Sequence, residues 1–167
     1  MVIVKLKRDT YGSKTNYLEH ALKYVGDPKK SRYLAGFGID PYDLNRCYEQ
    51  MKTVKEYYHK TGDNPMVHFI ISFGSNVKKE WQAINLSYYI ARCFKDQYQV
   101  LWCVHQKIRG DSRYHIHMVV NSVNLVDGKL INTSPEFMSN FCKYIRDVVD
   151  DDCRYYFASL KSSDDVD

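Results

Sequence analysis

Apolar and polar residues alternate in several short stretches of the chain, which is the pattern of half-buried β-strands. Residues 66–73 and 114–123 combine this pattern with β-branched and aromatic side chains. A polar loop at residues 106–113 joins two such stretches, so we expect an antiparallel hairpin over residues 99–123. The predicted strands cover residues 2–6, 33–37, 66–73, 99–105 and 114–123. The first begins like an edge strand, and residues 153–160 are apolar enough to pack against the others.

Four longer stretches repeat apolar residues with helical spacing. One of them carries an apolar stripe over residues 18–25, and the turn Gly26-Asp27-Pro28 ends it. Asp40-Pro41 and Ser134-Pro135-Glu136 are typical helix starts, because a capping side chain stands before a proline of the first turn. The predicted helices cover residues 13–25, 41–60, 77–94 and 134–149.

The order of these elements predicts the fold class. Helices and hairpin-linked strands in this sequence favour an α+β domain, with helices on one face of a mostly antiparallel central sheet. The chain shows no internal repeat, linker or low-complexity tract, so we expect one domain over residues 1–161. Residues 162–167 are acidic and are expected to form a disordered tail.

Composition narrows the class of protein. The 167 residues are 44% hydrophobic and 26% charged, as in a globular domain, and no apolar run approaches the length of a membrane span. The net charge of +4 favours a polyanionic partner only weakly. Five cysteines at wide spacing, without a CxxC pair, fit reduced thiols in a cytosol. We therefore expect a cytoplasmic protein without membrane insertion.

Three histidines form the strongest candidate for a chemical site. Because side chains alternate along a strand, His115 and His117 share one face of the strand at 114–123. His105 ends the preceding strand of the same hairpin and can lie beside them. Three imidazoles on adjacent strands can bind one divalent ion and leave positions open for substrate. The alternative is that these side chains are merely hydrogen-bonded, since a histidine on a strand more often is.

A nucleophile for such a site is not fixed by composition. The chain contains no GxSxG, P-loop or HExxH motif. A tyrosine can act as a nucleophile and form a covalent intermediate. The chain has fifteen tyrosines, so their number alone cannot select one.

Three segments in order resemble the motifs of P-type (MOBP) mobilisation relaxases, DNA-nicking enzymes of the HUH (His-hydrophobic-His) endonuclease superfamily. They are Leu18-Glu19-His20-Ala21-Leu22-Lys23-Tyr24-Val25 followed by Lys29-Lys30, then His68-Phe69-Ile70-Ile71-Ser72-Phe73, and finally Val104-His105 with His115-Ile116-His117-Met118-Val119-Val120-Asn121. Their order and spacing follow the family's. The resemblance implies a relaxase-like fold and a single nicking and strand-transfer domain.

The resemblance also implies roles for single residues. Tyr24 resembles the nucleophile that attacks a phosphodiester of single-stranded DNA, stays linked to the 5′ phosphate and frees a 3′ hydroxyl. Tyr17 lies two helical turns earlier and becomes the nucleophile if the first motif is aligned differently. The three histidines resemble the ligands of one divalent metal ion, with Mn²⁺ or Mg²⁺ expected first and Zn²⁺, Ni²⁺ or Co²⁺ also compatible with imidazole.

The second and third motifs add supporting residues. Ser72 resembles the serine that contacts DNA near the cleaved bond. His68 shares the strand face of Ser72, and Asn121 shares that of the histidines, so both are expected to support the ligands from behind. The chain also departs from its relatives. Lys107 stands where many carry an aspartate, and Gly74-Ser75-Asn76 replaces a frequent Pro-Gly-Glu.

Two basic loops are candidates for phosphate binding. One follows the predicted helix at 13–25 and the other leads into the histidine strand, and their alternative role is that of ordinary solvated loops. The candidate DNA-binding residues are Lys29, Lys30, Arg32, Lys107, Arg109 and Arg113.

The resemblance implies a bacterial conjugative relaxase that nicks and rejoins one strand at an origin of transfer. Its expected partners are single-stranded origin DNA, accessory relaxosome proteins and a coupling protein. Two alternatives stay open: a rolling-circle replication initiator of the same superfamily, and a non-catalytic relative that binds single-stranded DNA.

Overall fold

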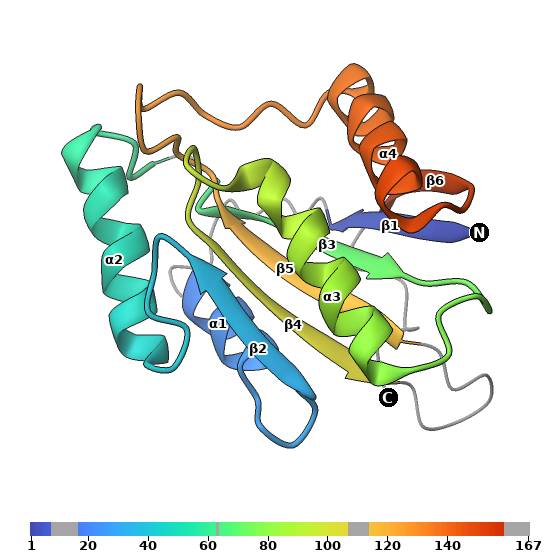
Figure 1. Ribbon diagram of the computed structural model, residues 1–167. Coiled ribbons are helices and arrows are strands. Elements are labelled where there is room, and N and C mark those ends of the chain that lie inside the picture. Colours follow the sequence, from blue (N-terminus) through green and yellow to red (C-terminus); the bar gives the residue numbers. More distant parts are fainter. Residues whose placement is uncertain (8–16, 63, 107–113, 159–167) are drawn as a thin grey trace.

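A six-stranded sheet forms the centre of the computed structural model, which describes residues 1–7, 17–62, 64–106 and 114–158 (Figure 1). The strand order is β2-β4-β5-β3-β1-β6, and every pair is antiparallel except β1 with β6. The strands are β1 (Val2–Lys7), β2 (Tyr33–Phe37), β3 (Met66–Ser72), β4 (Val100–Gln106), β5 (Tyr114–Asn121) and β6 (Cys153–Ala158). The α+β fold class and the hairpin of β4 with β5 are confirmed.

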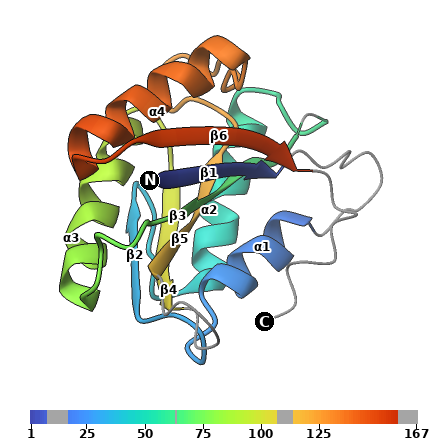
Figure 2. The same ribbon diagram turned by 90° about the vertical axis from the view of Figure 1, so that its right-hand side faces the viewer.

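Helices cover both faces of this sheet (Figure 2). We call the face that carries His105, His115 and His117 the histidine face. On it, α1 and α2 pack in a cluster that includes Leu101 and Val119. On the opposite face, α3 and α4 pack against a larger cluster. The helices are α1 (Tyr17–Val25), α2 (Leu44–Tyr57), α3 (Glu80–Ala91) and α4 (Pro135–Val149), and the 3₁₀-helix η1 (Arg92–Phe94) extends α3.

Two expectations about the sheet are wrong. Helices on one face alone would leave half of β4 exposed, whereas residues 100–105 are all buried, which requires cover on both faces. The first strand is not at an edge, because β6 pairs with β1 in parallel along its whole length. From the sequence, residues 153–160 are expected to pack against the other elements but are not identified as a strand. The pairing of β6 with β1 is therefore not predicted.

Caps set the ends of two helices. Ser134 caps α4 as expected, with its hydroxyl accepting from the N–H of Phe137. The second helix begins later than residue 41, because the Asp43 carboxylate accepts from the N–H of Arg46 at 3.0 Å. Asp40 instead accepts from the N–H of Tyr42 and closes a turn before the helix.

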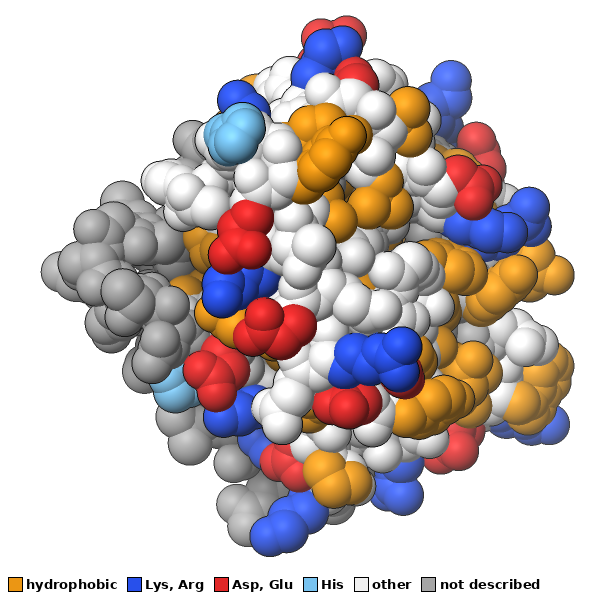
Figure 3. Space-filling model, turned by 90° about the vertical axis from the view of Figure 1, so that its left-hand side faces the viewer, with side chains coloured by type: hydrophobic (Ala, Val, Ile, Leu, Met, Phe, Trp, Pro, Cys, Tyr) orange, Lys and Arg blue, Asp and Glu red, His pale blue; other side chains and the backbone are white. Residues whose placement is uncertain are grey.

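The outer face of α2 carries interspersed charges, as seen on the side of the molecule in Figure 3. Lys52 lies 3.9 Å from Glu49 and 3.7 Å from Glu56, one helical turn away on either side. Such exposed pairs contribute little to stability, but they leave no single-sign field on this side. None of the helices that the structure describes has the length and apolar character to cross a bilayer.

A buried polar network holds the inner face of α2 against the sheet. Lys55 is 6% exposed, and its ammonium donates to the side-chain oxygen of Asn121. The Asn121 amide donates in turn to the carbonyl of Met51 at 3.1 Å and to Gln99 at 2.8 Å. Burial lowers the pKa of Lys55 from its ordinary 10.5 to about 7.

This buried lysine predicts a pH dependence of stability. Between pH 7 and 10.5 the unfolded chain holds more protons at Lys55 than the folded chain does, so the free energy of unfolding rises with pH. We expect a rise of about 1–2 kcal/mol between pH 7 and 8.5 in urea unfolding. The thiols of Cys47, Cys93 and Cys103 act in the opposite direction, because desolvation raises their pKa from the ordinary 9.0 to about 12 in the folded chain. Their effect starts as pH approaches 9, where the unfolded thiols ionise, so it is the smaller one over this window.

The slope should disappear in Lys55→Met. The control is Lys52→Met, on the exposed face of the same helix, which should keep the slope. An unchanged slope in Lys55→Met would show that Lys55 is not the group that titrates.

Candidate active site

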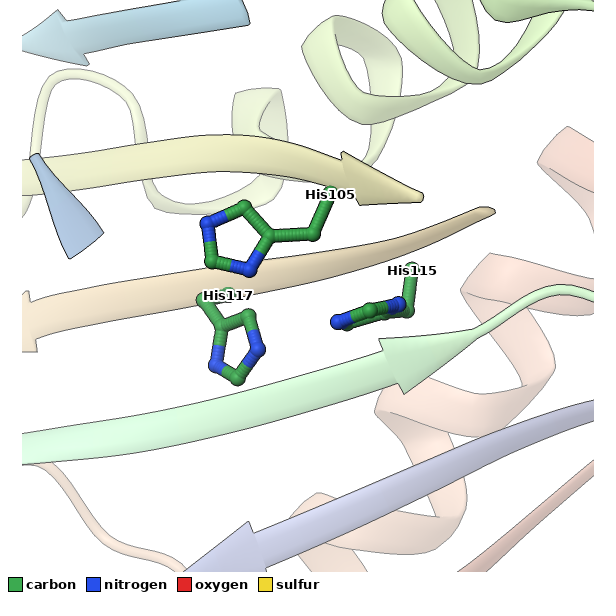
Figure 4. Close-up of side chains that lie close together, drawn as sticks. All are labelled: His105, His115 and His117. Atoms are coloured by element: carbon green, nitrogen blue, oxygen red, sulfur yellow. The ribbon is translucent and has the colours of Figure 1, made fainter. Parts of the chain in front are cut away.

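Three imidazoles meet on the histidine face where β4 and β5 pair. His105 lies directly opposite His115, and His117 follows two residues along β5. One possible ligand nitrogen from each lies within 4.8 Å of the others. His105 and His117 are buried, whereas His115 is half-buried. The structure thus brings together the residues that strand parity predicts to share a face (Figure 4), while their role as metal ligands stays a prediction.

Two buried neighbours fix the orientation of these rings. His68 Nε2 lies 3.1 Å from Nδ1 of His117, and Cys103 Sγ lies 3.1 Å from Nε2 of His105. The remaining nitrogens, Nε2 of His117 and Nδ1 of His105, face the space between the three rings (Figure 4). A hydrogen bond to one imidazole nitrogen orients the other toward a metal ion, so His68 and Cys103 hold the set in a ligand-like arrangement.

The electrostatics keep the central imidazole neutral. The pKa of His117 lies well below its ordinary value, first because the ring is buried and then because of the nearby His68, His115 and His105 and the charge of Lys7. A neutral ring keeps a lone pair on the nitrogen that is not protonated. Three imidazole nitrogens this close together are a donor set that fits one divalent transition-metal ion.

Tyr24 extends from α1 over the histidines. Its ring centroid lies 5.1 Å from that of His117 and 6.0 Å from that of His105, with edge-on geometry in both cases. The apolar stripe of α1, buried against the sheet, fixes this position. Tyr17 is the first residue of the same helix, two turns before Tyr24. Both tyrosines pack against the hydrophobic cluster that includes Leu101 and Val119.

The other predicted site residues fall into two groups. Ser72 lies opposite His115 in the pairing of β3 with β5, at the rim of the histidines. His68 lies one strand away, opposite Val119, and reaches His117. Asn121 shares their face, but its amide contacts Lys55, Met51 and Gln99, so it joins α2 to the sheet instead of supporting the ligands.

The basic loop after α1 is exposed and reaches the tyrosine. Lys30 Nζ lies 4.8 Å from the centroid of the Tyr24 ring. Lys29 and Arg32 are also exposed, and the N–H of Arg32 donates to the carbonyl of Val104, next to His105. The second predicted loop, with Lys107, Arg109 and Arg113, lies outside the described residues, as does the tail at 162–167.

Sequence reasoning missed three residues of this site. Lys5 and Lys7 point to the histidine face from β1, and Lys7 lies opposite His68. Their alternation with the apolar Val4 and Leu6 indicates that both lysines share one face of the strand. It does not indicate which strand lies beside β1 in the sheet. Cys103 also escaped, because a cysteine in an apolar strand has the appearance of core.

Comparison with known proteins places this geometry in a family. Residues 17–151 match the model of the family described as relaxase, MobA/VirD2-like, nuclease domain. No curated protein matches the chain. A solved structure described as the molecular basis of vancomycin resistance transfer in Staphylococcus aureus is similar with a TM-score of 0.52 and 15% identity, over 72% of this chain and 68% of that chain. At that identity the similarity shows a shared fold. The match over residues 17–151 shows that the chain belongs to the MobA/VirD2-like relaxase nuclease-domain family.

Proposed function

We propose that this protein nicks and rejoins one strand of DNA at an origin of transfer, with Tyr24 as the nucleophile. The observation that carries the proposal is the position of the Tyr24 ring, 5.1 Å from His117 in the centre of the histidine cluster. Membership of a relaxase nuclease family supports DNA nicking in general. The resemblance to relaxase motifs implies the covalent mechanism, and the position of Tyr24 beside the histidines supports the choice of this tyrosine.

His105, His115 and His117 are proposed to hold one divalent ion, with Mn²⁺ or Mg²⁺ first and Zn²⁺, Ni²⁺ or Co²⁺ as alternatives. A bound ion would polarise the non-bridging oxygens of a phosphodiester and stabilise charge that develops on them. His68 and Cys103 keep their ligands turned toward the ion. Ser72, which lies opposite His115, is proposed to contact DNA beside the reacting phosphate.

The proposed step exchanges one phosphodiester for another. The Tyr24 hydroxyl oxygen forms a bond to phosphorus and loses its proton, while the bond from phosphorus to the 3′ oxygen breaks and that oxygen gains a proton. The products are a 5′-phosphotyrosine and a free 3′ hydroxyl. Because a phosphodiester is kept, the same groups can reverse the step, which suits strand transfer. Packing of α1 against the sheet supplies the fixed approach that such an attack needs.

Single-stranded origin DNA is the proposed substrate, and Lys29, Lys30 and Arg32 are proposed to bind its phosphates. In this proposal the protein works in a bacterial cytoplasm with accessory relaxosome proteins and a coupling protein. This strand-transfer activity differs from simple cleavage because the protein retains the free 3′ end and rejoins it to the 5′ phosphate.

The nucleophile is tested with Tyr24→Phe, which removes only a hydroxyl. We expect the wild type to form a covalent protein–oligonucleotide band on a denaturing gel, with single-stranded origin DNA and Mn²⁺ or Mg²⁺. Tyr24→Phe should abolish this band and keep DNA binding. Tyr17→Phe is the matched control on the same helix and should keep the band. The opposite result would make Tyr17 the nucleophile, and a band in both variants would exclude this helix.

Metal binding is tested directly with Mn²⁺ and the electron paramagnetic resonance of the free ion. We expect one ion per chain, and His115→Gln should weaken binding by more than about tenfold because it removes a ligand. His59→Gln, at an exposed histidine after α2, is the control. Equal affinity in the wild type and His115→Gln would contradict the site.

The loop is tested through the salt dependence of binding to single-stranded DNA. Each phosphate contact contributes about 0.7 to the slope of log affinity against log salt. A Lys29→Gln/Lys30→Gln/Arg32→Gln variant should therefore lose about 2 from that slope. The control variant Lys78→Gln/Lys79→Gln/Lys143→Gln changes the same charge at exposed positions and should keep the slope. Equal slopes in the loop variant and the wild type would show that these three residues are solvated surface charges that do not contact DNA phosphates.

A further inference from the structure

The histidine face continues beyond the histidines, across β3 and β1 to the edge strand β6. Its outer part carries two lysines from β1 and an arginine and a tyrosine from β6. We call these four residues the β1–β6 strip; they are Lys5, Lys7, Arg154 and Tyr156. The alternate residues of both strands bury against the opposite face, so the strip side chains share the histidine face by strand parity.

Two rows of paired residues connect the strip to the histidines. In one, His115 lies opposite Ser72, Ser72 opposite Ile3, and Ile3 beside Arg154. Neighbouring strands are about 4.8 Å apart, so Arg154 lies roughly 14 Å from His115 across the sheet. At one phosphate per about 3.4 Å of stacked strand, this distance corresponds to about four nucleotides.

The second row leads from the central histidine to an aromatic ring. His117 lies opposite Ile70, Ile70 opposite Lys5, and Lys5 beside Tyr156. Tyr156 is 49% exposed, a large fraction for an aromatic side chain, and it lies outside the two hydrophobic clusters of the described residues. An exposed ring beside cations is the combination on which unpaired bases stack while their phosphates are neutralised.

The basic residues of the strip begin beside the histidines. Lys7 lies opposite His68 and is close enough for its charge to act on His117. Arg154 is exposed at the far end. Three aspartates, at 150–152, precede β6; Asp151 is paired with the amino group of Met1 at 2.6 Å, and Asp152 is exposed. The strip thus places three basic side chains along a line that starts at the histidines.

We propose that the β1–β6 strip binds the single-stranded DNA that flanks the reacting phosphate, with Lys5, Lys7 and Arg154 on phosphates and Tyr156 stacked on a base. This inference rests on the proposed function and adds a second DNA segment to it. The loop at Lys29, Lys30 and Arg32 lies near β2 and β4, toward the other edge of the sheet. A bound strand would therefore cross the sheet and meet cations on both sides of Tyr24.

The test uses fluorescently labelled oligo-deoxythymidine without metal, so that binding is measured apart from cleavage. We expect wild-type affinity to increase between oligonucleotides of about 4 and about 24 nucleotides, because only the longer one spans from the loop at Lys29, Lys30 and Arg32 across the histidines to the strip. Tyr156→Ala should weaken binding of the longer oligonucleotide at least about fivefold and change the shorter one little. Lys5→Gln/Arg154→Gln should lower the salt slope for the longer one by about 1.4.

Matched controls lie on the opposite face. Tyr89 in α3 is 50% exposed, nearly the same as Tyr156, and Tyr89→Ala should leave both affinities unchanged. Tyr156→Phe keeps the ring and should bind like the wild type. Thermal unfolding of each variant shows whether it is folded, and the exposed position of Tyr156 predicts little change.

The outcomes separate this proposal from the proposed function. Equal affinities of Tyr156→Ala and Tyr89→Ala for the longer oligonucleotide, with an unchanged salt slope in Lys5→Gln/Arg154→Gln, would overturn the strip, even if Tyr24 forms the covalent band. Loss of length-dependent binding in the strip variants, with no covalent band from any DNA, would support the strip as a binding surface and contradict the nicking activity.

Discussion

The register between β4 and β5 is the constraint on which the whole site depends. It sets His105 opposite His115 and Cys103 opposite His117. A slip of one residue in either strand would turn its imidazoles into the opposite face, because side chains alternate with a period of two. That face is filled by large buried side chains such as Trp102 and Met118. Exchanging these for imidazoles would expose apolar surface and bury polar nitrogens, so the core of one face fixes the chemistry of the other.

Burying several imidazoles together is costly, and the surroundings offset that cost in two ways. Hydrogen-bonding contacts engage the rear nitrogens, through His68 behind His117 and Cys103 behind His105. Burial and the neighbouring imidazoles lower the pKa of His117, so this central ring adds no positive charge to the cluster. The other nitrogens, Nε2 of His117 and Nδ1 of His105, face the space between the rings (Figure 4). The same features that make the cluster tolerable in a folded protein therefore also support its proposed role as a ligand set.

The sequence was most informative where a local period decides the structure. Alternation alone put His115 and His117 on one face, and the loop between the paired strands brought His105 beside them. It was least informative about neighbours distant in sequence. Nothing in residues 2–7 indicates that β6 pairs with them in parallel, so the lysines of β1 had no predicted place near the histidines. Asn121 shows the complementary error, because its face was inferred correctly while its partner, a lysine buried in α2, could not be seen from β5.

The proposed nucleophile and the histidines come from different elements, and this division suits a reversible reaction. The histidines are fixed by the sheet, whereas Tyr24 is held by the apolar stripe of a nine-residue helix. In the proposed reaction one DNA end becomes covalently attached to that helix and the other is released as a 3′ hydroxyl. Rejoining then requires the released end to stay close, and only non-covalent contacts can keep it there. Cations lie toward both edges of the sheet, Lys29 and Arg32 near β2 and Arg154 on β6, so either end of a strand lying across the histidine face would remain held. A protein that only cleaves DNA has no need to hold both ends. The distribution of basic residues around the histidines is therefore evidence for strand transfer over degradation, in the same way as the identity of the nucleophile is.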